Sequence, residues 1–186
     1  MTAWIQTFSG IAWNLEAPRA DDVRLVDIAH ALARICRFTG HTRGDRIYSV
    51  AQHSVLVATY VELQHPELYL AALLHDAHEA YLGDISRPLG TLLPGFAELK
   101  RAHDRVIAEW AGIAPTDFQH PAVREADAVM LATEANTHLP DGCKGDWGDL
   151  PPPWEGACVA AWSVSDAERE LTARIEQATN EDGDEP

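Results

Sequence analysis

Residues 48–84, YSVAQHSVLVATYVELQHPELYLAALLHDAHEAYLGD, predict two helices joined by a short turn. Ser49 and Gln52 fit a capping box, in which Ser is the N-cap and Gln occupies the third helical position. The second helix should begin near Pro66, because proline is well tolerated at the first helical position, and should end near Gly83. Since the connection at QHPE is short, we expect the two helices to pack antiparallel.

The end of the second helix carries more ionisable groups than a helix rich in Ala and Leu needs. They are His75, Asp76, His78, Glu79, Tyr81 and Asp84. In a regular helix each residue advances by about 100°, which places Asp76 at about 100° and Glu79 at about 40° from His75. These three side chains therefore share one face, whereas His78 falls about 60° to the other side and is interpreted as a bystander. Burying such a polar face requires partners that satisfy its charges and hydrogen bonds. Tyr81 is not assigned a role.

A metal ion is the partner that the surrounding residues favour. His53 lies in the first turn of the first helix, and the antiparallel arrangement brings it level with His75 and Asp76. Asp127 is a carboxylate within the apolar segment PAVREADAVMLATEAN, and Glu125 is a weaker rival by helical phase. Imidazole and carboxylate groups are the usual ligands of Zn, Mn, Fe or Co. The sequence thus predicts a divalent metal held by His53, His75, Asp76 and Asp127.

The rest of the chain predicts a single all-α domain over residues 1–186. Apolar residues at near-helical spacing predict a helix over about residues 23–35. Three more helices are expected over about residues 94–111, 121–136 and 165–178, the last of them charged. Residues 2–16 could form a short β element, and the segment at 139–156, rich in Pro and Gly, is a predicted loop. We expect the acidic tail at about 180–186 to be disordered.

The amino-acid composition argues against several classes of function and location. The 186 residues carry 14 Lys+Arg against 29 Asp+Glu, a formal net charge of -15, which argues against binding a nucleic-acid polymer. No apolar run approaches the roughly 20 residues of a membrane span, and the N-terminus lacks the features of a signal peptide, so we expect a cytoplasmic protein without a membrane partner. Cys36, Cys143 and Cys158 form no CxxC pattern, which favours neither a disulfide framework nor a thiolate zinc site.

The pattern of His53, the doublet His75-Asp76 and Asp127 resembles the H…HD…D signature of the HD-domain metal-dependent phosphohydrolases. The resemblance covers about residues 27–134. Arg37-Phe38 followed by YSVAQHS and LLHDAHEAYLGDI is similar to the small HD nucleotidases that hydrolyse 2′-deoxynucleotides. It resembles in particular the phage-type branch, which includes the dATP triphosphohydrolases of phages that replace adenine by 2-aminoadenine. The resemblance implies an all-α HD-domain helical bundle and a homo-oligomer.

The resemblance also implies roles for single residues. The four ligands named above match those of the main metal, which would be Zn, Co or Mn. Glu79 and Asp84 match catalytic acidic residues, which act on the attacking water or on further Mg, Mn or Co ions at the substrate phosphates. Arg37 matches a phosphate-contacting arginine. Phe38 stands where the bacterial nucleotidases have a Trp packed on the sugar, which disfavours a 2′-hydroxyl.

Three functions follow from this resemblance. The first is a triphosphohydrolase that releases triphosphate from dATP or another dNTP, and the second is a 5′-deoxynucleotidase that dephosphorylates dNMPs. The third is a nucleotide or metal sensor that has lost turnover. Glu79 and Asp84 argue against this function, because a sensor has little need of carboxylates beyond the metal ligands. A purely structural helical protein is not expected to carry a polar face of this composition on a buried helix.

Taken singly, several of these residues also fit structural roles. Asp127 could be a solvated helix acid, Asp84 a loop acid or cap, and Arg37 a cation closing its helix. Glu134, seven residues after Asp127 and nearly on the same face, is favoured as a supporting residue rather than a ligand. The loop residues His41 and Arg43 could touch substrate. The remaining histidines are interpreted as incidental: His30, His65, His78, His103, His120 and His138.

Overall fold

The computed structural model describes residues 3–141 and 147–181. Their elements are β1 (Trp4–Gln6), β2 (Ala12–Asn14), η1 (Ala20–Asp22), α1 (Leu25–Leu32), η2 (Arg37–Gly40), α2 (Val50–Glu62), η3 (Pro66–Leu68), α3 (Tyr69–Leu74), α4 (Glu79–Leu82), α5 (Arg87–Leu92), α6 (Phe96–Ala111), η4 (Asp117–Gln119), α7 (Pro121–His138) and α8 (Val164–Glu181). This order confirms an all-α fold with a short N-terminal β element. In this part of the chain, no helix combines the length and the apolar character that crossing a membrane requires.

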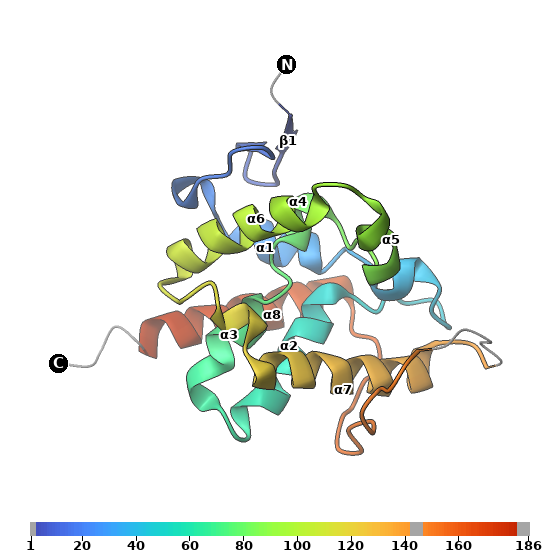
Figure 1. Ribbon diagram of the computed structural model, residues 1–186. Helices are drawn as coiled ribbons and strands as arrows, with labels where there is room; N and C mark the ends of the chain where they lie inside the picture. The colour runs from blue at the N-terminus through green and yellow to red at the C-terminus, as the bar shows by residue number, and fades with distance from the viewer. Residues whose placement is uncertain (1–2, 142–146, 182–186) are drawn as a thin grey trace.

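Helix α2 is the centre of the molecule. It packs against α3, α7 and α8, and Figure 1 shows it between α7 and α8. Most of its residues are buried, as expected for a helix that is apolar nearly all round. His53, in its first turn, lies beside His75, the residue that follows α3, with ring centroids 5.4 Å apart. The two helices therefore run antiparallel, as the short connection predicts.

The start of α2 is capped as predicted, but only on one side. The Ser49 hydroxyl accepts a hydrogen bond from the backbone N–H of Gln52 at 3.2 Å. The Gln52 side chain does not return to Ser49, which corrects the second half of the capping box. Its Nε2 donates instead to the Ala160 carbonyl, and its Oε1 accepts from the Trp162 N–H, both at 2.9 Å. This amide therefore ties α2 to the segment that leads into α8.

The second predicted helix is interrupted at the His-Asp doublet, which corrects the phase argument above. Helix α3 ends at Leu74, and α4 begins only at Glu79. Between them the backbone makes tight i→i+3 hydrogen bonds, from Ala77 N to Leu74 O and from Glu79 N to Asp76 O, both 2.9 Å. In such 3₁₀-like geometry residues three apart point the same way. Asp76 and Glu79 are therefore aligned.

Other boundaries differ from the predictions in smaller ways. The helix expected at 94–111 begins at Phe96, after Gly95 with φ 81°, and a separate helix, α5, precedes it. Helices α7 and α8 extend slightly beyond their predicted ends at 136 and 178. The described parts of 139–156 contain neither helix nor strand, which confirms the loop. Of the expected disordered tail, residues 180 and 181 belong to α8, and 182–186 lie outside the described residues. Cys143 also lies outside them, whereas Cys36 and Cys158 are free thiols.

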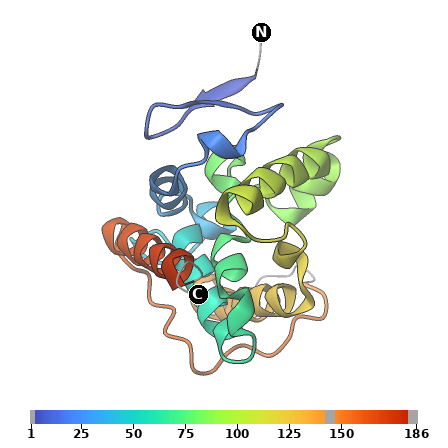
Figure 2. The same ribbon diagram turned by 90° about the vertical axis from the view of Figure 1, so that its left-hand side faces the viewer.

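The N-terminal hairpin is anchored by Trp13. Strands β1 and β2 pair antiparallel with Ile5 opposite Trp13, and Figure 2 shows the hairpin and α7 at opposite ends of the molecule. The fully buried Trp13 ring stacks on Tyr81 of α4 with centroids 3.8 Å apart. Its Nε1–H donates to His103 Nε2 at 3.1 Å, while His103 Nδ1 donates to the Leu99 carbonyl at 2.9 Å. The hairpin thus holds α4, the helix that begins at Glu79.

Replacing Trp13 by Ala should lower the free energy of unfolding by about 3–5 kcal/mol, because the change empties a large buried volume. Trp4→Ala is the matched control: Trp4 lies on the paired strand and is 57% exposed, so its loss should cost less than about 0.5 kcal/mol. Urea unfolding followed by circular dichroism measures both. Equal losses for the two variants would contradict the anchoring role.

Candidate metal centre

Three predicted ligands from three parts of the chain meet at one point. Each of His53, His75 and Asp127 offers a ligand atom, and these atoms all lie within 4.8 Å of one another. His53 comes from α2, His75 follows α3, and Asp127 is on α7. The imidazoles are buried, whereas the Asp127 side chain is 30% exposed. A site built in this way is closed on its histidine side and open to solvent on its carboxylate side.

The hydrogen bonds of the two histidines determine which nitrogen faces the centre. His75 Nδ1 lies 2.7 Å from the Ala72 carbonyl, which can only accept, so Nδ1 carries the hydrogen. His53 Nδ1 donates in the same way to Glu134 Oε1 at 2.7 Å. In each neutral imidazole the lone pair then resides on Nε2. This is the tautomer in which Nε2 can bind a metal.

The two Nε2 atoms are buried, and neither forms a hydrogen bond within the described residues. His53 Nε2 lies 3.3 Å from Asp127 Oδ1, and His75 Nε2 lies 3.2 Å from Asp76 Oδ2, but neither pair has the direction of a hydrogen bond. Lone pairs of nitrogen and carboxylate oxygen at this distance repel one another unless a cation joins them. Burial and the Arg37 charge lower the pKa of His53, yet Glu134 and Asp127 outweigh them and raise it to about 9. Below that pH, a metal ion has to displace a proton from Nε2 before this nitrogen can bind it.

Glu134 supports His53 from behind. Its carboxylate is fully buried and accepts hydrogen bonds from the Tyr48 hydroxyl at 2.9 Å and from Arg37 Nη2 at 3.0 Å, besides the bond from His53. Burial raises the pKa of Glu134, but the charges of His53 and Arg37 more than offset this and lower it to about 2. Glu134 is therefore an ionised carboxylate that orients the His53 ring, and it is in neither group of ligand atoms.

Asp76 lies between two groups of ligand atoms. Its Oδ2 is 3.2 Å from His75 Nε2 and 3.7 Å from His53 Nε2, beside the first group. It also belongs to a second group, with His78 and Glu79, whose ligand atoms lie within 4.8 Å of one another. Burial raises the pKa of Asp76, and the neighbouring histidines, His75 first, lower it well below its usual range. Asp76 is thus an ionised carboxylate that can serve either group.

The predicted catalytic acids sit on the same side. Glu79 is buried, and its Oε2 has no hydrogen-bond partner among the residues that the structure describes. Burial, followed by the charges of Asp76 and Asp84, raises the pKa of Glu79 to about 10. Asp84 is half-buried and in neither group; burial also raises its pKa, and it feels the charges of Arg37 and Asp76. A cation placed here would lower the pKa of both carboxyl groups.

Arg37 supplies a positive charge to this acidic region. Four carboxylates, Glu134, Asp76, Asp127 and Glu79, raise its pKa against the effect of burial, so it stays charged. Its Nε and Nη2 both donate to Glu134 Oε2, at 3.2 and 3.0 Å.

Phe38, the residue after Arg37, has a left-handed backbone (φ 54°, ψ 31°), and its ring lies 5.5 Å from Arg37 Cζ. Thr39 is also left-handed, and such a conformation costs about 1–2 kcal/mol for each non-Gly residue. The loop beyond does not bring Arg43 to the ligand groups: its N–H donates to the His138 carbonyl, and its guanidinium pairs with Asp141.

Sequence reasoning missed the place of His78. Its imidazole is buried and belongs to the second group, because the tight turn replaces the regular helix on which its bystander assignment rested. Its Nδ1 lies 3.1 Å from Oδ1 of Asp104 on α6, a residue for which the sequence carried no signal. His103 and His138 are buried, and both form hydrogen bonds outside the two groups.

Comparison with known proteins places the chain in a family. No family model matches it. Over 132 residues, 71% of the chain and 70% of the relative, it is 42% identical to the uncharacterized protein YfdR of Escherichia coli. The chain belongs to the YfdR family. Over 144 residues, 72% of the chain and 71% of the relative, it is also 37% identical to the uncharacterized protein RCAP_rcc00048 of Rhodobacter capsulatus.

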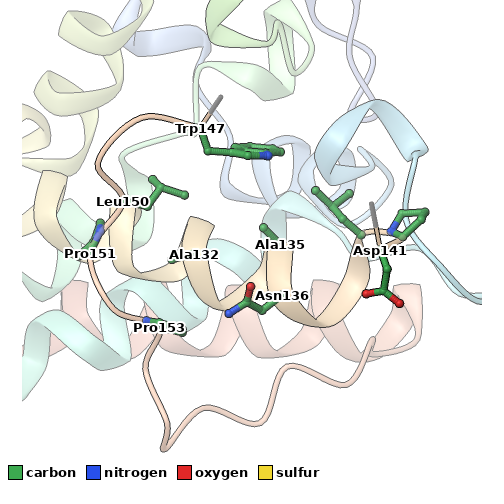
Figure 3. Close-up of a pocket in the computed structure, with 10 residues that line it drawn as sticks. Ala132, Ala135, Asn136, Asp141, Trp147, Leu150, Pro151 and Pro153 are labelled. Carbon is green, nitrogen blue, oxygen red and sulfur yellow. The ribbon is translucent and has the colours of Figure 1, made fainter. Parts of the chain in front are cut away.

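This YfdR-family chain has a cavity of about 380 Å³ on the outer face of α7 (Figure 3). It is lined by Ala132, Ala135, Asn136, Leu139, Pro140, Asp141, Trp147, Leu150, Pro151 and Pro153. None of these residues belongs to either ligand group. One connection leads back to the site, since the Trp147 ring meets Phe38 edge-on with centroids 6.4 Å apart.

Glu134→Gln should weaken binding of Co²⁺ to the first group by about 10–100-fold, because outer-shell carboxylates tune the ligands that they orient. The matched control is Glu125→Gln, an exposed acid on the same helix, which should leave the affinity unchanged. Isothermal titration calorimetry at a temperature where thermal unfolding shows both variants folded measures the effect. Wild-type affinity in Glu134→Gln would contradict the role of this carboxylate.

Proposed function

We propose that this protein is a divalent-metal-dependent phosphohydrolase that acts on 2′-deoxynucleotides. The observation that carries the proposal is the pair of buried, unpartnered Nε2 atoms of His53 and His75, turned together with Asp127 toward one point. Their Nδ1 atoms are held by Glu134 and by a backbone carbonyl, so both lone pairs face inward. Two neutral imidazoles and carboxylates suit Zn, Co or Mn. The donor set therefore fits the metal that the HD signature implies.

The surrounding residues support hydrolysis at phosphorus. A bound divalent ion makes hydroxide available near neutral pH and polarises a phosphoryl oxygen. Glu79 lies one tight turn after Asp76. A bound cation would lower its pKa from about 10, and its carboxylate is then suited to accept a proton from the attacking water. With Asp84 nearby, this side of the site carries several negative charges. A phosphate can approach them only where cations compensate the repulsion.

Arg37 is the side chain that we assign to the substrate phosphate. It lies among four carboxylates that keep it charged, and its bonds to Glu134 use Nε and Nη2. We assign Nη1 to a phosphoryl oxygen, where the guanidinium offsets charge that builds during the reaction. Phe38 follows directly, and it forms an aromatic pair with Trp147, a residue that lines the α7 cavity. This pair is suited to pack against the nucleoside.

The substrate that we favour is dATP or another dNTP, with release of triphosphate, because the overall pattern resembles the phage-type branch. Hydrolysis of dNMPs would use the same residues, and product analysis separates the two. In a panel of deoxy- and ribonucleotides from mono- to triphosphate, tested with Co²⁺, Mn²⁺ and Zn²⁺, we expect triphosphate from dATP. Orthophosphate from dAMP alone would replace the triphosphohydrolase by the nucleotidase. No hydrolysis of any nucleotide would overturn the proposal.

Glu79→Gln should lower kcat on the active substrate by about 10²–10⁴-fold while Co²⁺ still binds the first group, because the change removes a base and keeps the shape. Glu62→Gln, at an exposed position on α2, is the matched control and should keep full activity. Steady-state kinetics together with calorimetry separates loss of catalysis from loss of metal. Unchanged turnover in Glu79→Gln would remove Glu79 from the mechanism and favour another base.

A further inference from the structure

The cavity on the outer face of α7 has the size and composition of a site for a small molecule. Its volume of about 380 Å³ lies within the roughly 300–1,000 Å³ of such sites. The described lining is mostly apolar, with Trp147, two leucines and three prolines (Figure 3). Of its two polar side chains, Asp141 is paired with Arg43 at 2.8 Å, which leaves the Asn136 amide for a ligand. A flat aromatic ring with polar atoms at its edge fits this composition.

Trp147 offers this cavity an open aromatic surface. The residue is 44% exposed. Its ring meets the Phe38 ring at an interplanar angle of 75°, with centroids 6.4 Å apart. Such an edge-to-face contact covers at most one face of the indole. The other face is therefore available to stack on a planar ligand.

The backbone beside Arg37 is strained where it carries Phe38 to this junction. Phe38 and Thr39 both have left-handed backbones with φ 54°, and the turn is closed by a 3.0 Å hydrogen bond from the His41 N–H to the Phe38 carbonyl. Strain of this kind persists only where the surrounding structure enforces it, and it gathers at ligand sites. The strained turn places the Phe38 ring in contact with both the Arg37 guanidinium, at 5.5 Å, and the Trp147 ring.

The loop that follows this turn is attached to the end of α7 beside the cavity. The Arg43 N–H donates to the carbonyl of His138, the last residue of α7, at 2.7 Å. The Arg43 guanidinium pairs with Asp141, which lines the cavity. The segment that carries Arg37 and Phe38 is therefore joined directly to the wall of the cavity.

We propose that the α7 cavity holds the nucleobase of the substrate, with the Trp147 indole stacked on one face of the base. The inference rests on the proposed function, because Arg37 is assigned there to the substrate phosphate. A nucleotide whose phosphate reaches Arg37 then passes Phe38 with its sugar and meets Trp147 with its base, in the order in which these groups are linked. Stacking on an aromatic side chain tolerates any base, because every base has a π face. Trp147 therefore recognises nucleobases as a class.

Binding of 2′-deoxyadenosine to the full chain tests this subsite without metal or hydrolysis. The indole N–H signal of Trp147, identified by its absence from Trp147→Ala, should shift when the nucleoside is added. By saturation-transfer NMR, Trp147→Ala should raise the dissociation constant of the nucleoside by about 5–100-fold, whereas Trp147→Phe should keep most of the affinity. Trp4→Ala is the matched control, because Trp4 is also exposed but lies on the hairpin at the opposite end of the molecule, and it should bind like the wild type.

The sugar 2-deoxyribose carries no base and should leave the Trp147 signal unchanged. Wild-type affinity in Trp147→Ala, a Trp147 signal that 2′-deoxyadenosine does not move, or an equal response to 2-deoxyribose would each overturn the subsite. Hydrolysis of a nucleotide with the same KM in the wild type and in Trp147→Ala would refute this inference and leave the proposed function standing. Nucleoside binding that depends on Trp147, without hydrolysis of any nucleotide, would do the reverse.

Discussion

Glu134 is a fully buried carboxylate, and its 2.7 Å hydrogen bond to His53 is the interaction on which the candidate site depends. The bond joins α2 to α7 and determines which nitrogen of His53 faces the centre. A buried charge of this kind needs compensation, which Arg37 and the Tyr48 hydroxyl provide. Removing one member of such a network typically costs about 3–5 kcal/mol, so the same contacts shape the site and hold two core helices together.

The interrupted helix after α3 is the second constraint. A regular helix would spread the ionisable side chains of this segment around its axis, and a buried neighbour would then have to accommodate each one separately. The tight turn aligns Asp76 with Glu79. The Trp13 ring stacks on Tyr81 and so supports α4. The N-terminal hairpin therefore contributes to the geometry of the site without supplying a ligand.

Local sequence signals were enough to predict most of the fold. The cap at Ser49, the start at Pro121 and the break at Gly83 located helix ends, and the short QHPE turn predicted the antiparallel pair. The packing of these helices also brings His53, His75 and Asp127 together. Each residue comes from a different segment, and the short turn already indicated how the first two segments pack.

The remaining features depend on contacts between distant residues. Arg37 and Glu134 are 97 positions apart, and His78 meets Asp104 across 26, so no local pattern reveals either pair. The helical phase of His78 was misread because α-helix and 3₁₀-turn sequences look alike, and hydrogen bonding decides between them. The Gln52 side chain likewise prefers partners near the start of α8 over its own cap.

The proposed metal centre requires that the Nε2 atoms of His53 and His75 bind one metal ion. Anomalous diffraction at the cobalt edge from crystals of the Co²⁺-loaded chain tests it most directly. We expect an anomalous peak about 2.0–2.1 Å from both Nε2 atoms, with an Asp127 oxygen as a further ligand. A protein that takes up no cobalt, or a peak bound elsewhere while both Nε2 atoms stay unoccupied, would contradict it.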